Sequence, residues 1–413
     1  MNRVKLLLIA PTFYPAHSGA GLRFYRYLPF FYQNQIDVTV ITGTPKIGKP
    51  TSSQTDESYW ENSDDGKLVS TTEKFGAKIY KYKLPISGAK KRAKILLSEA
   101  FALCNDKENR PDVVHIIAPM PISVMSELRR IKKTGVKLIY SHTIWLEMNN
   151  GLFANILQSW KARAVLSQYV CILVQSEALK KNIKKVIPKA NIKIISNGVD
   201  TNEFSPVSTQ EEKILLRKKF NLNPSVKYIS FVGAIHPRKG VDLLIDAWRR
   251  LVSQYNDIHL LLIGPRIEKP SKEITSFYLQ IDNAIAESGF EKNVHFLGHI
   301  TDVGDYLKLS DIFVFPSRRE GMPNALLEAM STSMPVILTP FIGLSSELGR
   351  NNYEFICVEH SSDAIASSIE SLLGSEEQMQ TLARQARNWV CQNMELSKSA
   401  KSHLELYKSL INP

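Results

Sequence analysis

Residues 311–330 read Asp311-Ile-Phe-Val-Phe-Pro-Ser-Arg-Arg-Glu320-Gly-Met-Pro-Asn-Ala-Leu-Leu-Glu328-Ala-Met330. The four apolar residues after Asp311 show no polar alternation, which is typical of a strand buried on both faces of a parallel sheet. A polar loop follows, and the segment after it predicts a helix with Asn324 as its N-cap. A buried strand that leads through a loop into a helix is part of a βαβ unit, so this stretch predicts an α/β fold.

The same alternation of short apolar runs and helix-length segments extends over the whole chain. We interpret thirteen runs as strands: Val4–Ala10, Val38–Thr42, Lys78–Lys83, Val113–Ile117, Lys137–Tyr140, Cys171–Val174, Ile192–Ile195, Tyr228–Val232, His259–Ile263, Val294–Leu297, Ile312–Phe315, Val336–Leu338 and Phe355–Val358. Thirteen strands are too many for one ordinary doubly wound sheet. The sequence therefore predicts two sheets of about six or seven strands each.

The boundary between the two domains is predicted near residues 197–200 and the polar stretch that extends to Glu212. Residues 44–77 are polar and lack periodicity, so we expect a long mobile loop after the second strand. The final stretch, 396–411, has helical spacing and no strand after it, so it could cap either domain.

Composition excludes several classes of protein. Of the 413 residues, 44% are hydrophobic, which fits buried cores and excludes a largely disordered chain. The four cysteines form no close pairs, which excludes a disulfide-stapled module and a CxxC zinc site. The basic, apolar N-terminus could be a signal peptide or a first strand, but its apolar run is short and stops at Pro11, which favours the strand. No apolar run approaches the roughly 20 residues that span a bilayer, so we expect a cytoplasmic protein.

Positive charge is concentrated in the first half of the chain. The net charge is +12, yet residues 1–200 hold 30 Lys and Arg against 15 Asp and Glu, whereas residues 201–413 hold 22 against 25. The basic clusters at 78–94, 129–133 and 180–185 could be solvated helix faces or a surface for an anionic partner, such as a membrane, an acidic lipid or a nucleic acid. Nucleic acid has the least support because no basic groove with interleaved aromatic residues is evident.

The segment between the first strand and the next helix contains Gly19 and Gly21. A glycine-bearing turn at this place can bring backbone N–H groups close to a bound anion, or it can serve only as a tight turn. No third glycine follows and no acid ends the second strand, so a nicotinamide dehydrogenase is disfavoured.

The second half of the chain opens in a similar way, with Gly233 after a strand and with Arg238 and Lys239 before a helix. Two cations beside a helix N-terminus can hold a diphosphate. On its own, a Lys after a strand is usually a surface residue.

Glu320 and Glu328 belong to the stretch quoted first. Glu320 follows the strand and Glu328 falls in the first turns of the helix, so both can face the carboxyl edge of the sheet, where open α/β folds bind ligands. Carboxylates accept hydrogen bonds from sugar hydroxyls, and the free N–H groups of Gly321–Ala325 can donate others.

This Glu320/Glu328 pair is one of several motifs by which the sequence resembles the retaining nucleotide-sugar glycosyltransferases of family 4 over essentially the whole chain. The motifs that carry the resemblance are Gly19-Ala-Gly21, Pro111-Asp-Val-Val-His115, Ser141-His142-Thr143, Val174-Gln-Ser-Glu177, Asn197-Gly-Val-Asp200, Gly233 with Lys239-Gly240, Glu320-x7-Glu328 and Thr339-Pro-Phe-Ile-Gly343-Leu-Ser-Ser-Glu347. The resemblance implies the GT-B fold, an α/β architecture of two Rossmann-like, doubly wound parallel-sheet domains that face an interdomain cleft. Residues 1–200 with 396–413 would form the acceptor-binding domain, and residues 201–395 the nucleotide-sugar-binding domain.

The resemblance also implies roles for individual residues. Glu328 would bind the ribose hydroxyls of the donor, Glu320 would contact the donor sugar, and Lys239 would neutralise the leaving diphosphate. Arg238 and His142 complete the implied catalytic set. The other implied donor-binding residues are Gly19, Gly21, Gly233, Gly321, Met322, Pro323, Asn324 and Ala325.

Three positions depart from the family pattern. Ala234 stands where an Arg is usual, with Arg238 as the natural substitute. Ile117 stands where a His is frequent, and His142 is the candidate for part of that role. Leu344 replaces a common second Gly. The two remaining histidine candidates, His17 and His115, have less support, because a lone His is more often structural.

The function implied is retaining transfer of a sugar from a UDP- or GDP-sugar to a glycan or lipid-linked acceptor. No Asp-x-Asp element suited to a metal is evident, so we expect neither metal nor cofactor, and Lys239 and Arg238 would stabilise the leaving group. The resemblance favours front-face attack, in which the departing phosphate oxygen takes the acceptor's proton. The alternative is a non-catalytic nucleotide- or sugar-binding protein on the same fold. In either case the basic first domain could attach peripherally to the inner face of a membrane.

Overall fold

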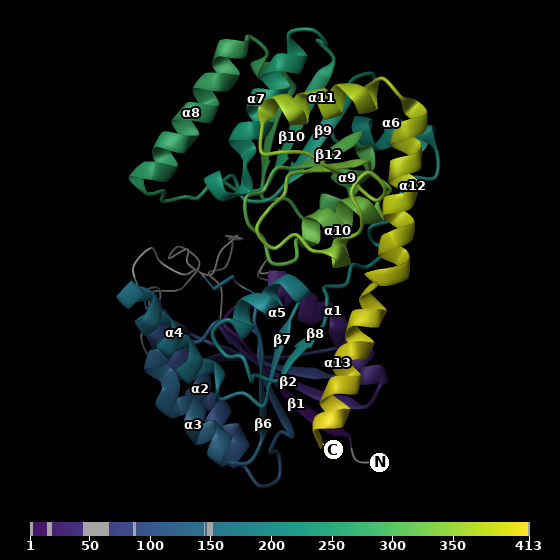
Figure 1. The fold of residues 1–413 in the computed structure, drawn as a ribbon. Helices are drawn as coiled ribbons and strands as arrows, with labels where there is room; N and C mark the ends of the chain where they lie inside the picture. The colour runs from purple at the N-terminus through teal and green to yellow at the C-terminus, as the bar shows by residue number, and fades with distance from the viewer. Residues whose placement is uncertain are drawn as a thin grey trace. The chain divides into compact units, whose positions relative to one another are not determined.

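The computed structural model describes residues 3–14, 19–43, 66–85, 88–143, 145–146 and 152–411, without the side chains of 152–157. The chain divides into two compact units (Figure 1). Unit 1 comprises Met1–Asn197 and Ser397–Pro413, and unit 2 comprises Gly198–Leu396. These boundaries fall within three residues of those expected from the sequence.

Unit 1 is built on an eight-stranded sheet with the order β3-β4-β2-β1-β5-β6-β7-β8. Its strands are β1 Val4–Ala10, β2 Ile36–Gly43, β3 Leu68–Lys74, β4 Ala77–Tyr82, β5 Val113–Ile116, β6 Lys137–Ser141, β7 Cys171–Val174 and β8 Ile192–Ile194. Its helices are α1 Gly19–Gln33, α2 Ala89–Asn105, η2 Ile122–Val124, α3 Met125–Lys133, α4 Leu152–Leu166, α5 Glu177–Lys184 and α13 Leu396–Ile411. All strand pairs are parallel except β3 with β4, as buried βαβ units require.

The edge strand β3 was not predicted. The expectation of a loop over 44–77 is wrong for residues 68–74, and residues 44–65 lie outside the described part of the chain. β3 is exposed along almost its whole length, so it lacks the buried apolar run by which the other strands were recognised. The turn that joins it to β4, Phe75-Gly76, has positive φ at both residues (48° and 70°), which is the geometry of a two-residue hairpin.

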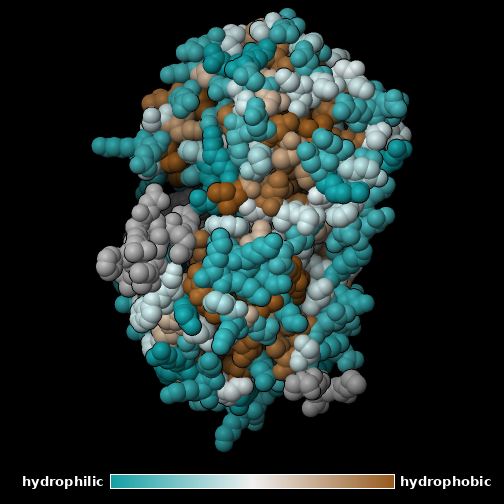
Figure 2. All heavy atoms as spheres, viewed as in Figure 1, coloured by the Kyte–Doolittle hydropathy of each residue, from teal (hydrophilic) through white to brown (hydrophobic). Residues whose placement is uncertain are grey.

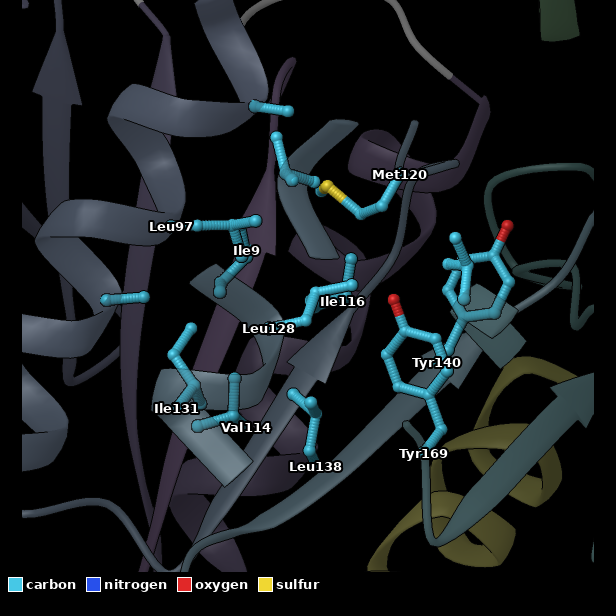
Figure 3. Close-up of a cluster of buried hydrophobic side chains, with 14 of the residues drawn as sticks. Ile9, Leu97, Val114, Ile116, Met120, Leu128, Ile131, Leu138, Tyr140 and Tyr169 are labelled. Carbon is cyan, nitrogen blue, oxygen red and sulfur yellow. The ribbon is translucent and has the colours of Figure 1, made fainter. Parts of the chain in front are cut away.

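A continuous apolar core fills the space between the unit 1 sheet and the helices α2 and α3. Figure 3 shows side chains of the sheet, Ile9, Val114, Ile116 and Leu138, turned toward Leu97 of α2 and toward Leu128 and Ile131 of α3. These side chains are fully buried. Burial of each large side chain stabilises the unit by about 1.5–3 kcal/mol. This burial holds the apolar faces of α2 and α3 against the sheet, so their opposite faces are exposed to solvent.

The last helix, α13, belongs to unit 1 and is held there by a buried polar network. The side chain of His115, in β5, has Nδ1 2.8 Å from the hydroxyl of Tyr407 in α13 and Nε2 2.8 Å from Ser141 Oγ. Burial lowers the pKa of His115 well below its usual value and that of the adjacent His403 to about 3. Both rings are therefore neutral in the folded unit, and His115 has a structural role.

Tyr407→Phe is expected to lower the free energy of unfolding by about 1–3 kcal/mol, because it leaves His115 Nδ1 buried without its partner. Urea denaturation followed by circular dichroism measures the change. Tyr32→Phe is the control, since Tyr32 is 48% exposed and should lose almost nothing. Equal stability of both variants would show that this network does not hold α13.

Unit 2 is built on a six-stranded sheet with the order β11-β10-β9-β12-β13-β14, all parallel. Its strands are β9 Lys227–Val232, β10 Ile258–Ile263, β11 Val294–Gly298, β12 Ile312–Phe315, β13 Val336–Leu338 and β14 Ile356–Cys357. Its helices are α6 Gln210–Lys219, η3 Pro237–Lys239, α7 Val241–Val252, α8 Lys272–Ser288, η4 Glu291–Asn293, α9 Val303–Leu309, α10 Asn324–Ser331, η5 Ser346–Leu348, α11 Ser362–Leu373 and α12 Glu376–Asn393.

Helices cover both faces of the unit 2 sheet. One apolar core lies between the sheet and α7, α8 and α11, and a second lies between the sheet and α9, α10 and α12. Unit 2 is thus doubly wound, as predicted. Hydrophilic residues cover most of the surface visible in Figure 2, as expected where the apolar faces of the helices are turned inward.

Candidate active site

The centre of the unit 2 sheet is its topological switch point. The chain runs from β9 outward to β10 and β11 on one side, and from β12 outward to β13 and β14 on the other, while β9 and β12 are neighbours. Open α/β sheets bind ligands beyond the carboxyl ends of the strands at such a point. The loops that follow β9 and β12 carry Lys239 and Glu320.

Backbone hydrogen bonds tie these loops to each other and to the loop after β13. Arg318 N donates to Arg238 O (2.9 Å), Ile342 N donates to Arg318 O (2.9 Å), and Glu320 N donates to Ile342 O (3.0 Å). The loops after β9 and β12 can come this close because residue 240 is a glycine. Its φ is +69°, and a Cβ atom there would lie 2.0 Å from Pro316 O. The site is therefore built on loops that are joined by backbone hydrogen bonds.

Three side-chain donors surround one carboxylate oxygen, Oε1 of Glu320. Glu320 Oε1 lies 2.7 Å from Lys239 Nζ and 3.1 Å from Arg238 NH1, and it accepts a hydrogen bond from Ser317 Oγ (2.7 Å). Glu320 and Lys239 are mostly buried, whereas the side chain of Arg238 is 45% exposed. Two cations against one carboxylate leave the cluster net positive, which suits a phosphate-bearing ligand.

His236 and Ser317 were missed by the sequence analysis. His236 Nδ1 accepts a hydrogen bond from Arg238 N (3.0 Å), and burial, together with Arg238 and Lys239, lowers its pKa. The neutral ring therefore caps η3 and orients the backbone that carries both cations. The available signals were the His two residues before Arg238 and the Ser three residues before Glu320.

The segment from Gly321 to Glu328 follows directly. Met322 and Pro323 are buried, and α10 begins at Asn324, so Glu328 lies in its second turn, partly buried. The expectation that Asn324 is the N-cap is wrong: Pro323 caps the helix in an extended conformation without a side-chain hydrogen bond, and Asn324 is already helical. Glu320 and Glu328 thus stand on one strand–loop–helix unit.

The remaining candidates lie in unit 1. Gly19 and Gly21 form the first turn of α1, so the expectation of a glycine loop before the helix is wrong at these two positions. The buried face of α1 begins at Gly21 and continues with Arg23 and Phe24. Gly21 is itself buried.

His142 follows β6 at the carboxyl edge of its sheet. It is buried, its backbone N–H donates to Leu173 O (2.8 Å), and its ring packs edge-on against Tyr140. His17 lies outside the described residues. Lys239, Arg238 and Glu320 are therefore brought together by unit 2, whereas His142 and the α1 glycines belong to unit 1.

Two α/β units on predominantly parallel sheets, one with a cationic cluster at its switch point, define a protein of the GT-B class. A family model described as "Glycosyltransferase Family 4" matches residues 18–203, and one described as "Glycosyl transferases group 1" matches residues 212–389. The chain belongs to glycosyltransferase family 4.

Curated relatives include enzymes of surface-glycan synthesis. The chain is 26% identical to the lipopolysaccharide core biosynthesis mannosyltransferase LpsB of Rhizobium meliloti, over 53% of this chain and 61% of that protein. It is 30% identical to the capsular polysaccharide biosynthesis glycosyltransferase CapM of Staphylococcus aureus, over 53% of this chain and 56% of that protein. It is 25% identical to the Escherichia coli UDP-Gal:alpha-D-GlcNAc-diphosphoundecaprenol alpha-1,3-galactosyltransferase, over 68% of this chain and 66% of that protein. The match thus spans only about six tenths of the first two relatives.

Solved structures share the fold over almost the whole chain. Sucrose-phosphate synthase from Thermosynechococcus elongatus superposes with a TM-score of 0.78 at 17% identity, covering 99% of this chain and all of that one. Anabaena Alr3699/HepE in complex with UDP-glucose superposes with a TM-score of 0.71 at 15% identity, covering 98% of this chain and all of that one. At these identities the likeness concerns the fold.

Proposed function

We propose that this protein is a retaining glycosyltransferase that moves a sugar from a nucleoside-diphosphate sugar to a glycan or lipid-linked acceptor. The observation that carries the proposal is the cluster of Lys239, Arg238 and Ser317 around Glu320 Oε1 at the switch point of unit 2. Membership of family 4 and the names of its relatives supply the acceptor class.

The donor is assigned to unit 2. Glu328 binds the ribose hydroxyls, and Glu320, held by its three donors, contacts the sugar. Backbone N–H groups of the Gly321–Ala325 segment and Gly233, the first residue after β9, complete the donor-binding set. Among bases, uridine is favoured because the relative and the structure just described are named with UDP-sugars.

The chemistry follows from the charges. As the bond between the anomeric carbon and the phosphate oxygen breaks, the leaving diphosphate gains negative charge, which Lys239 Nζ and the guanidinium of Arg238 neutralise. Ala234 stands where the family pattern has an arginine, and the proposed substitute is Arg238, whose guanidinium reaches Glu320 Oε1. The acceptor hydroxyl attacks from the face that the diphosphate leaves, and the departing phosphate oxygen takes its proton. No protein base is required, no metal is needed, and His142 positions the acceptor.

The experiment that tests the function is a hydrolysis screen of pure protein against UDP- and GDP-sugars. Slow release of nucleoside diphosphate from one of them supports an enzyme. Binding without any release would favour the alternative, a non-catalytic nucleotide-sugar-binding protein, to which the departures at Ala234 and Ile117 point.

We further propose that unit 1 docks on an anionic membrane surface. α2 and α3 pack together with their apolar residues inward, and hydrophilic residues predominate where they lie in Figure 2. Their exposed cations are Lys90, Lys91, Lys94, Arg129, Arg130, Lys132 and Lys133. On α4, Trp160 is 62% exposed, a residue that favours membrane interfaces. Among the described helices, none is long and apolar enough to cross a membrane.

Replacement of Lys90, Lys91, Lys132 and Lys133 by Gln is expected to weaken binding to phosphatidylserine vesicles at least tenfold, since each cation near such a surface contributes about 1 kcal/mol. Co-sedimentation at rising salt measures it, and wild-type binding should fall as the screening length shrinks from about 10 Å to about 3 Å. The control neutralises four exposed lysines of unit 2: Lys218, Lys269, Lys272 and Lys292. Salt-independent binding, or equal loss in both variants, would contradict docking through α2 and α3.

A further inference from the structure

A cavity lies in unit 2 at the opposite edge of the sheet from Glu320. It has a volume of about 480 Å³ and is lined by the start of α6, the segments that lead into β12 and β13, and α12. Figure 1 shows α6 and α12 at the same side of the unit. Asp311, which precedes β12, is in its wall, whereas the donor loop follows β12. A volume of this size is within the range of small-molecule sites, about 300–1,000 Å³.

Both oxygens of the Asp311 carboxylate have partners in this wall. Oδ1 lies 2.7 Å from Lys213 Nζ, and Oδ2 lies 2.7 Å from Arg217 NH2 and accepts a hydrogen bond from Tyr228 N (2.7 Å). Two cations already share this one carboxylate, and the group is 8% exposed. Asp311 therefore has no capacity to neutralise further cations around the cavity.

Three more cations line the cavity without an acidic partner in the described part of the chain. The side chains of Lys308 and Arg384 form no ion pair or hydrogen bond among the described residues, and Arg384 is exposed. Arg387 donates to the carbonyl oxygens of Phe204, Ser331 and Thr201, which hold its guanidinium in place but leave its charge uncompensated. The only other carboxylate of the lining, Glu376, accepts a hydrogen bond from Gln380.

This excess of positive charge is local. Residues 201–413 carry more acidic than basic residues, 25 against 22, so the basic cavity stands out from its unit. Cations that repel one another around a hollow are costly unless an anion occupies it. Hydroxyl and amide groups of Thr209, Ser333 and Asn388 line the cavity together with the apolar side chains of Met334, Pro335 and Met379. The hydroxyl and amide groups can bind ligand hydroxyls, and the apolar side chains can pack against the face of a sugar ring.

We propose that this cavity is a binding site for a small organic phosphate of sugar-phosphate size, distinct from the donor site. Lys308, Arg384 and Arg387 face the phosphate, and the hydroxyl and amide groups bind the sugar hydroxyls. The site shares α10 with the donor site, since Glu328 lies on this helix and its C-terminal end leads into the cavity wall at Thr332–Met334. The proposal does not depend on which nucleotide sugar the protein uses.

Calorimetric titration of the full chain with glucose 1-phosphate tests the proposal. Lys308→Gln/Arg384→Gln is expected to weaken binding at least tenfold and to remain folded, because neither side chain has a partner among the described residues. The matched control, Lys272→Gln/Lys292→Gln, changes the charge equally on exposed positions elsewhere in unit 2 and should bind as wild type does. Lys239→Ala, in the donor site, should also bind glucose 1-phosphate normally.

The same titration with inorganic phosphate and with glucose separates the ligand classes. Inorganic phosphate should bind at least tenfold more weakly than glucose 1-phosphate, and glucose should not bind measurably. The proposal is overturned if wild type does not bind glucose 1-phosphate, if the Lys308/Arg384 variant binds it unchanged, or if only Lys239→Ala loses it. Equal binding of inorganic phosphate would overturn the organic part of the ligand assignment.

Discussion

Lys239→Ala is expected to lower the turnover of glycosyl transfer by about 100- to 1,000-fold, the usual cost of removing one preorganised donor from a developing anion. Lys239 Nζ is held 2.7 Å from Glu320 Oε1, in a mostly buried position where solvent screens its charge poorly. The protein should stay folded, because Glu320 keeps Arg238 and Ser317 as partners. Steady-state release of nucleoside diphosphate measures the change.

Two further variants make this result specific. Arg238→Ala should lower turnover less than Lys239→Ala, since its side chain is 45% exposed, and the double variant should be the slowest of the three. Lys269→Ala, an exposed lysine of the same unit, should retain the activity of wild type. Full activity in the double variant would remove both cations from the reaction.

Glu328→Ala is expected to weaken nucleotide binding by about 10- to 100-fold, because a hydrogen bond to a charged group contributes about 1.5–3 kcal/mol. Glu328 lies in the second turn of α10, whose buried face is formed by Leu326, Leu327 and Met330, so its removal leaves the packing of the helix intact. Calorimetry with UDP measures the affinity, and Glu273→Ala, exposed in the first turn of α8, is the control. An unchanged affinity for UDP would place the ribose elsewhere.

Buried strands were the part of the fold most open to prediction. All thirteen expected strands exist, with ends within two residues, because strands covered on both faces must be apolar throughout. Strand β3 was not predicted, because an exposed edge strand has no continuous apolar run. Its hairpin turn, Phe75-Gly76, also lacks the usual Asn or Asp. The division of the two sheets followed from strand number and from the polar stretch near residue 200.

Within the site, the positions of the residues along the chain could be predicted from the sequence, but most of their side-chain contacts could not. The sequence placed Glu320 and Lys239 in the segments that follow two strands. Only the structure shows that these strands are neighbours and that Arg238 and Ser317 join Lys239 on one oxygen of Glu320. The start of α1 at Gly19 and the extended cap at Pro323 depend on backbone angles that residue preferences do not fix. The cavity could not be predicted, since Lys308 and Arg384 are 76 positions apart and line the same space only through tertiary packing.

Retaining transfer from a nucleotide sugar is the central claim, and proton NMR of an α-linked nucleotide sugar incubated with the pure protein tests it most directly. The donor is the one that the hydrolysis screen selects. The account predicts that nucleoside diphosphate and the α-anomer of the free sugar appear together at first, before mutarotation produces the β-anomer. Initial release of the β-anomer, or a spectrum in which every nucleotide sugar stays intact, would contradict it.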